Sequence, residues 1–129
     1  RTKTTNRYFN YIYVRMGAHT LIHKRTEDDI WKNLFELPLV ETEKDLSEEE
    51  FLACPQFHAL FAEGEVRMVR TLLRGVKHVL SHRVIYTNFY EVTLPDNSSS
   101  FSSYQRVAVE DLGRYAVPRL IHAFLEKYV

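Results

Sequence analysis

The stretch that most constrains the fold of this chain is the apolar run over residues 83–94, RVIYTNFYEVTL. Most of its residues are β-branched or aromatic, which favours an extended strand. Apolar side chains occupy both alternating sets of positions, so each face of such a strand needs cover from other elements. The run therefore predicts the central strand of a sheet that is packed on both sides.

Other segments of the same character predict further strands around this run. They cover residues 8–16, 20–25, 34–37, 66–73 and 105–110. Gly17 and Ala18 separate the first two segments, so these are expected to form a hairpin. Pro38 closes the short third segment.

Two segments carry the signals of helices. Ser47 and Glu50 have the spacing of a capping box, and the helix that they begin is expected to run toward Ala62 with an interruption at Pro55. Residues 117–128 predict the second helix, with Pro118 in its first turn. Its apolar stripe consists of Leu120, Ile121, Phe124, Leu125 and Tyr128. A chain of mostly strands with two helices predicts an α+β domain.

The length of 129 residues suits one domain with its own core. Arg1 to Asn6 is a polar, basic lead-in, so we expect residues 1–6 to be the end of an interdomain linker and residues 7–129 to be the domain of a larger protein. No apolar run approaches the ~20 residues of a membrane span, and no signal peptide is visible, which predicts a cytoplasmic protein without membrane contact. The lone Cys54 excludes an internal disulfide and a multi-cysteine metal centre.

The net charge is zero, but the charges are unevenly distributed. Acidic residues dominate residues 27–50, whereas residues 66–83 contain no acid. The basic residues of that second segment are Arg67, Arg70, Arg74, Lys77 and Arg83. They predict a positive face of the kind that a phosphate backbone needs, or else a merely solvated surface.

The segment KHVLSH, which ends at His82, concentrates polar chemistry just before the central strand. His78 and His82 have the helical spacing of zinc ligands, but they lack the glutamate of an HExxH motif and a third ligand, so a metal site is not expected. Ser81 and His82 are neighbours on an extended chain and point to opposite faces, which argues against a nucleophile with its base.

The order of elements also resembles the Nudix hydrolases, whose signature G-x5-E-x7-R-E-U-x-E-E-x-G-U (U is aliphatic) carries magnesium-binding glutamates. With the first glutamate of the signature placed on Glu41, its glycine falls on Phe35 and its arginine on Glu49. The final acid pair becomes Ala53 and Cys54, which offer no oxygen cage to a hard cation. The resemblance thus implies a Nudix-like scaffold without Nudix chemistry.

Across nearly its whole length the chain resembles the C-terminal domain of the MutY-type A/G-specific adenine DNA glycosylases. The segments that carry the resemblance are RYFNYIYV, DDIWKNLFELPLVE, VKHVLSHRVI and DLGRYAVPRLIHAFLEKY. The resemblance implies a Nudix-like α+β fold, with a mixed β-sheet packed with two main helices. It also implies a bacterial, DNA-associated domain that reads 8-oxoguanine opposite adenine in double-stranded DNA during base-excision repair.

In that family a separate N-terminal domain removes the adenine and holds a 4Fe-4S cluster. The parent protein would therefore be an enzyme, whereas this fragment would hold neither catalytic residues nor a cofactor and would be inactive alone. The resemblance assigns contact with the oxidised guanine to Ser81, with Leu80 and His82 beside it in the recognition turn. We expect Lys77 and Arg83 to contact the DNA backbone, and His78 and His82 to brace the turn or approach backbone phosphates. Leu80 stands where the family has phenylalanine.

Other readings stay open at this point. A serine between two histidines before a strand is often an ordinary capped turn. The chain as a whole is alternatively a Nudix-type nucleotide pyrophosphohydrolase, or a protein-interaction module that uses the acidic residues 27–50.

Overall fold

The computed structural model describes residues 3–129 of the chain. Residues 1–2, the first part of the expected linker, lie outside this range, whereas Thr5 and Asn6 belong to the first strand. The elements in chain order are β1 (Thr5–Arg15), β2 (His19–Lys24), β3 (Phe35–Glu36), β4 (Leu39–Thr42), α1 (Glu48–Ala53), α2 (Pro55–His58), β5 (Met68–Val79), β6 (Arg83–Thr93), β7 (Gln105–Ala108), the 3-10 helix η1 (Val109–Arg114) and α3 (Arg119–Tyr128).

The main sheet has four strands in the order β4-β1-β6-β5. β1 runs parallel to β6 along its whole length, while β4 and β5 are antiparallel to their neighbours, so the sheet is mixed. The predicted central strand is confirmed: β6 lies inside the sheet, and Ile85, Phe89 and Tyr90 on its two faces are fully buried. These strands with helices on both sides confirm the α+β class.

The hairpin expected from the first two strands forms only at its turn. Met16 and His19 exchange a pair of backbone hydrogen bonds around Gly17 and Ala18. Beyond this bridge β2 leaves β1 and joins a second sheet in the order β3-β2-β7. The expected pairing is therefore wrong beyond the turn, because β6 occupies one edge of β1 while β4 and the carbonyl of Pro38 occupy the other.

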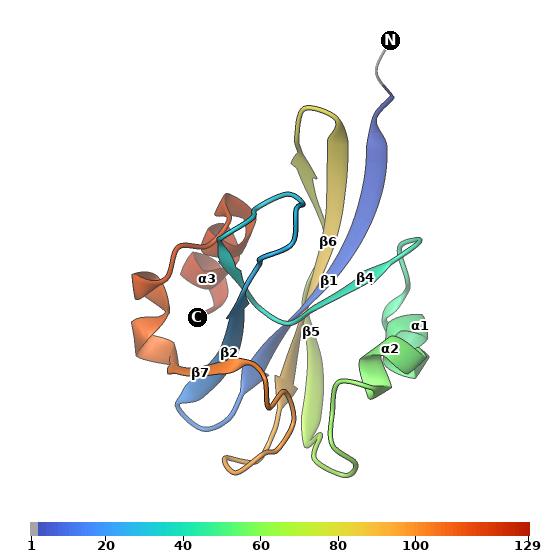
Figure 1. Cartoon of the computed structure of the whole chain (residues 1–129). Helices are drawn as coiled ribbons and strands as arrows, with labels where there is room; N and C mark the ends of the chain where they lie inside the picture. Colours follow the sequence, from blue (N-terminus) through green and yellow to red (C-terminus); the bar gives the residue numbers. More distant parts are fainter. Residues whose placement is uncertain (1–2) are drawn as a thin grey trace.

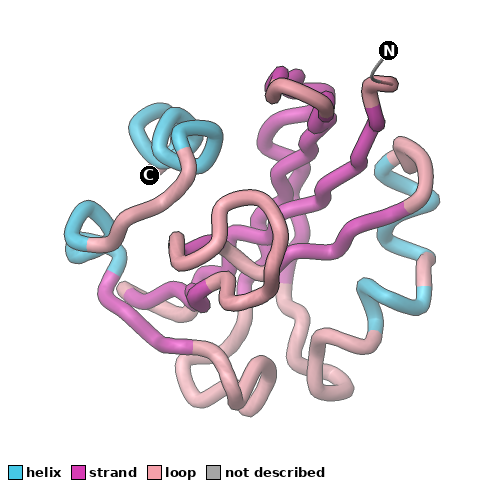
Figure 2. Tube along the Cα trace, turned by 45° about the horizontal axis from the view of Figure 1, so that its top comes forward, coloured by secondary structure: helices cyan, strands magenta, loops and turns pink. Residues whose placement is uncertain are grey.

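The helices cover the two faces of the main sheet, and Figures 1 and 2 show α3 on one side and α1 with α2 on the other. On the α3 side, Phe124 stacks on Phe89 and belongs to the same buried cluster as Phe9 and Tyr11. On the α1 side, the core holds Ile12, Tyr90 and Val92 of the sheet with Phe51 and Phe57 of the helices. Alternate residues along β1 and β6 therefore supply two separate apolar layers.

The first helix begins where the sequence predicts. The Ser47 hydroxyl accepts a hydrogen bond from the Glu50 N–H, and the Glu50 carboxylate accepts one from the Ser47 N–H, which completes the capping box. The helix does not continue toward Ala62, however. Pro55 lacks an N–H and begins a separate short helix, so two helical segments replace the single interrupted one.

β5 is longer than expected and continues beyond Leu73 to Val79. The strand passes through two irregularities in its pairing with β6, and Gly75 adopts a positive φ of 71° within the second one, between Leu73 and Val76. This extension brings Lys77 and His78 into a strand. Among residues 3–129, no helix has the length and apolar character needed to cross a membrane.

Candidate functional site

The segment singled out in the sequence forms the tip of the β5–β6 hairpin (Figure 1). Lys77 and His78 were expected in a turn, but they lie in β5, where they pair with Tyr86 and Ile85. Arg83 opens β6, and only residues 80–82 form the connection. The structure therefore brings the six predicted residues together at one end of the sheet.

The tip is held by backbone hydrogen bonds on both of its sides. The Leu80 N–H donates to the Arg83 carbonyl at 2.8 Å, and the Thr5 N–H of β1 donates to the His82 carbonyl at 3.0 Å. Ser81 and His82 are exposed. The Ser81 hydroxyl is thus presented to solvent on a backbone that two strands anchor.

Two of the predicted residues make contacts toward the interior. His78 lies edge-to-face with Trp31, with ring centroids 6.0 Å apart. Leu80 is half-buried and packs against the core on the α3 side. These contacts brace the hairpin against the loop that carries Trp31. The roles of the six residues in binding DNA stay predictions.

The positive face predicted over residues 66–83 is narrower than its charges suggest. Arg70 forms an ion pair with Glu91, and Arg74 forms one with Asp45. These pairs neutralise the positive charge of β5 away from the hairpin tip. Lys77 and Arg83 are exposed and, among the described residues, have no acidic partner within 4 Å; the same holds for Lys3 just before β1. Uncompensated positive charge therefore gathers at the hairpin end of the sheet.

An ion-pair network that sequence reasoning missed holds the loop that carries Trp31. Arg7 binds Asp29 through two hydrogen bonds of 2.8 and 2.9 Å and also binds Glu41. Arg25 binds Asp29 at 2.9 Å and the buried Glu36 at 3.0 Å. Acidic residues of the 27–50 segment thus stabilise the fold through ion pairs. No local pattern could have revealed this, because Arg7 and Asp29 are 22 residues apart.

This network predicts a pH-dependent contribution to stability. The Arg7 guanidinium, together with a backbone hydrogen bond and Arg25, lowers the pKa of Asp29 to about 2 against the opposing effect of burial. A carboxylate whose pKa is lowered by folding stabilises the fold above its unfolded pKa of about 3.9 and loses that contribution as the pH falls toward its folded pKa.

We expect Asp29→Asn to lower the free energy of unfolding by about 1 kcal/mol at pH 7, since the ion pair is partly solvated. The difference from the unchanged chain should shrink between pH 4 and pH 2, and urea denaturation at several pH values measures it. Asp28→Asn, at the exposed neighbouring position, is the control. A difference that persists at pH 2 would contradict this assignment.

Two glutamates that align with acids of the Nudix signature make structural contacts. Glu41 binds Arg7, and Glu50 completes the capping box of α1. In the part of the chain that the structure describes, no three histidine, cysteine, aspartate or glutamate side chains are grouped so that they could hold a metal ion. A cavity of about 540 Å³ lies at the other end of β1, beside Tyr13 and Arg15, and is separate from the hairpin tip.

Several solved structures have a fold similar to that of this chain. The C-terminal domain of mouse MUTYH, solved in complex with human PCNA, is similar with a TM-score of 0.73 and 14% identity, over 95% of this chain and 86% of that one. A MutT structure from a study of the Aliivibrio salmonicida and Vibrio cholerae proteins has a TM-score of 0.64 and 16% identity, over 95% and 96%. MutT from Methanosarcina mazei Go1 has a TM-score of 0.61 and 17% identity, over 98% and 95%.

Because the sequence identities are low, these structural matches are evidence for the fold alone. They confirm that the chain has a Nudix-like fold. None of the curated protein sequences compared with the chain matches it significantly. A family model described as the NUDIX domain matches residues 10–127, from the first strand to the closing helix. Because this match spans nearly all of the sequence and the fold agrees with it, the chain belongs to the NUDIX domain family.

Proposed function

We propose that this chain is the lesion-recognition domain of an A/G-specific adenine DNA glycosylase, which reads 8-oxoguanine opposite adenine. The observation that carries the proposal is the exposed Ser81 hydroxyl on an anchored hairpin tip, next to the uncompensated charges of Lys77 and Arg83. The similarity to the C-terminal domain of mouse MUTYH supports it.

The chemistry of the lesion suits a hydroxyl at this position. 8-oxoguanine carries an N7–H donor where guanine has an acceptor, and it gains a carbonyl at C8. A serine hydroxyl accepts and donates hydrogen bonds, so it can engage this altered edge. A polar contact of this kind discriminates between bases by about 1–3 kcal/mol. Lys77 and Arg83 would contact phosphates and fix the register of the tip on the duplex.

In this proposal the chain supplies recognition, and the bond is broken in a separate catalytic domain with a 4Fe-4S cluster. The partners are a DNA duplex that contains the 8-oxoguanine:adenine mispair and that catalytic domain. Leu80 and His82 would flank the lesion, and His78 would brace the tip through its contact with Trp31.

The proposal predicts that the chain binds a duplex with 8-oxoguanine:adenine more tightly than one with guanine:adenine, and that Ser81→Ala removes most of this preference. The expected loss is about 1–3 kcal/mol, or roughly 5- to 160-fold in the ratio of the two affinities. Fluorescence anisotropy with labelled duplexes measures the affinity for each duplex. Low salt is used because phosphate contacts weaken as the salt concentration rises. Ser103→Ala, at another exposed serine, is the matched control. Equal weakening on both duplexes would argue against a specific role for Ser81.

The second candidate function is nucleotide pyrophosphohydrolysis, which the similarity to two MutT structures favours. It requires a set of carboxylates for magnesium, whereas Ala53 and Cys54 occupy the final acid positions of the signature. Incubation with 8-oxo-dGTP or dGTP and magnesium tests it. Release of pyrophosphate or phosphate by the purified chain would replace the first proposal with this one.

A further inference from the structure

One face of the main sheet is only partly covered by helices. On the side of α1 and α2, Ile12 and Tyr90 are completely buried. Near the hairpin tip the helices no longer cover this face of the sheet. Tyr8 and Tyr86 are half-buried there, and Val79 is 66% exposed. Figure 1 shows β1, β5 and β6 extending past α1 and α2 toward this end.

The strand register defines which residues share this uncovered area. Directly paired residues of neighbouring strands lie on the same face. One row across the sheet consists of Lys77, Tyr86, Tyr8 and Thr42, and the next row toward the tip consists of Val79, Val84 and Asn6. We call these two rows the open sheet end.

Aromatic stacking already exists within the open sheet end. The rings of Tyr8 and Tyr86 are stacked, with centroids 5.6 Å apart and planes 16° from parallel. Tyr8 and Tyr86 lie on the two central strands, and Thr42 and Lys77 on the outer strands flank them in the same row. A further planar ring can extend such a stack, as nucleic-acid bases do on the aromatic side chains of sheet surfaces.

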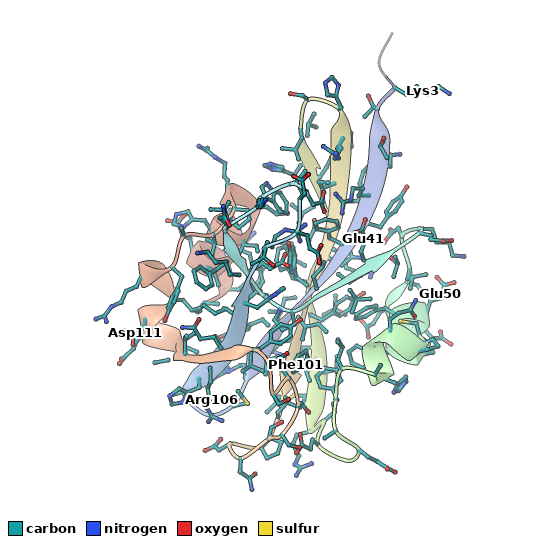
Figure 3. The ribbon with its side chains drawn as sticks, in the orientation of Figure 1. Lys3, Glu41, Glu50, Phe101, Arg106 and Asp111 are labelled. Carbon is teal, nitrogen blue, oxygen red and sulfur yellow. The ribbon has the colours of Figure 1, made fainter. Side chains whose placement is uncertain are left out.

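The charge at this end matches a polyanion. Lys77 lies in the same row as the tyrosines. Arg83 opens β6 at the same end of the sheet, on the opposite face. Lys3, labelled in Figure 3, precedes β1. Asp45, which follows β4, is occupied by hydrogen bonding to Asn88 and an ion pair with Arg74. Stacked rings next to exposed cations are the combination that binds bases and phosphates together.

We propose that the open sheet end binds single-stranded nucleic acid, with an unpaired base stacked on the tyrosine pair and a phosphate on Lys77. The ligand must be unpaired because a duplex keeps its base faces inside its own stack. Ser81 takes no part in this contact, so the inference goes beyond the proposed reading of a damaged duplex and does not depend on it.

The test compares two labelled oligomers of about ten units: oligothymidylate, and an abasic oligomer with the same number of phosphates. The chain is expected to bind the thymidine oligomer at least about fivefold more tightly, since stacking of one base contributes roughly 1–3 kcal/mol. Tyr8→Leu should abolish this difference, and Tyr8→Phe, which keeps the ring, should preserve it. Thermal unfolding of each variant verifies that it folds.

A second pair of variants avoids the half-buried tyrosines. Val79→Glu places a negative charge in the open sheet end and should weaken binding of both oligomers. Met68→Glu, at the exposed far end of the same strand, should leave both affinities unchanged. Equal binding of the two oligomers by the unchanged chain, no binding of either, or full binding by Tyr8→Leu would overturn the proposal. Ser81→Ala should not change binding of the thymidine oligomer. The Ser81 variant therefore tests the duplex proposal, and the Tyr8 variants test this one independently.

Discussion

Replacing Arg25 by methionine is expected to lower the free energy of unfolding by about 3–5 kcal/mol, because the buried Glu36 carboxylate loses its arginine and keeps His23 and the Tyr11 hydroxyl beside it. The Arg25 and Glu36 side chains are only 10% and 2% exposed, and Glu36 also accepts a hydrogen bond of 2.6 Å from the Tyr11 hydroxyl. For a domain of this size the midpoint of thermal unfolding should fall by roughly 10–20 °C. Differential scanning calorimetry measures it.

Two variants separate the buried charge from a general loss of contacts. The double variant Arg25→Met/Glu36→Gln removes the uncompensated charge and should recover part of the lost stability. Arg114→Met breaks a pair whose arginine is 79% exposed and should have almost no effect. Equal unfolding midpoints for Arg25→Met and Arg114→Met would show that the network is not a structural anchor of the loop.

Phe124→Ala should have an effect of similar size, about 3–5 kcal/mol, because it removes a large ring from the core on the α3 side. Phe124 is 2% exposed and stacks on Phe89, with centroids 4.2 Å apart and planes within 4°. Tyr13 and Tyr128 pack around the same ring. Chemical denaturation with urea measures the loss.

The size of this loss should follow the volume that is removed. Phe124→Leu keeps most of the volume and should cost clearly less than Phe124→Ala. His122→Ala, on the exposed side of the same helix, should change stability little. A loss for His122→Ala as large as for Phe124→Ala would mean that α3 contributes through its exposed face instead.

The sequence predicted the elements whose signals are local. The run over residues 83–94 is apolar on both faces, and this alone places β6 inside the sheet. Ser47 and Glu50 cap α1 because a capping box needs only residues three apart. The exposed position of Ser81 agrees with a polar turn before a strand.

The sequence could not predict features that depend on distant partners. The parallel pairing of β1 with β6 left β2 no place beside β1, so the expected hairpin does not extend beyond its turn. The extension of β5 was missed because Arg67, Arg70 and Arg74, spaced three and four residues apart, and Gly75 hide the period of a strand. Tyr8 and Tyr86 meet only through this parallel register, and no local motif marks them as a pair.

The pairing of β1 with β6 also has a consequence for the order of assembly. The side chains of Asn10 and Asn88, 78 positions apart, share a hydrogen bond between these two central strands. Contacts of such long range form slowly, because a large loop must close before they contribute. In a ribosome-bound chain β4 can already pair with β1, but the other edge of this apolar strand stays unpaired until β6 emerges. We expect early folding intermediates to be the most aggregation-prone species of this molecule.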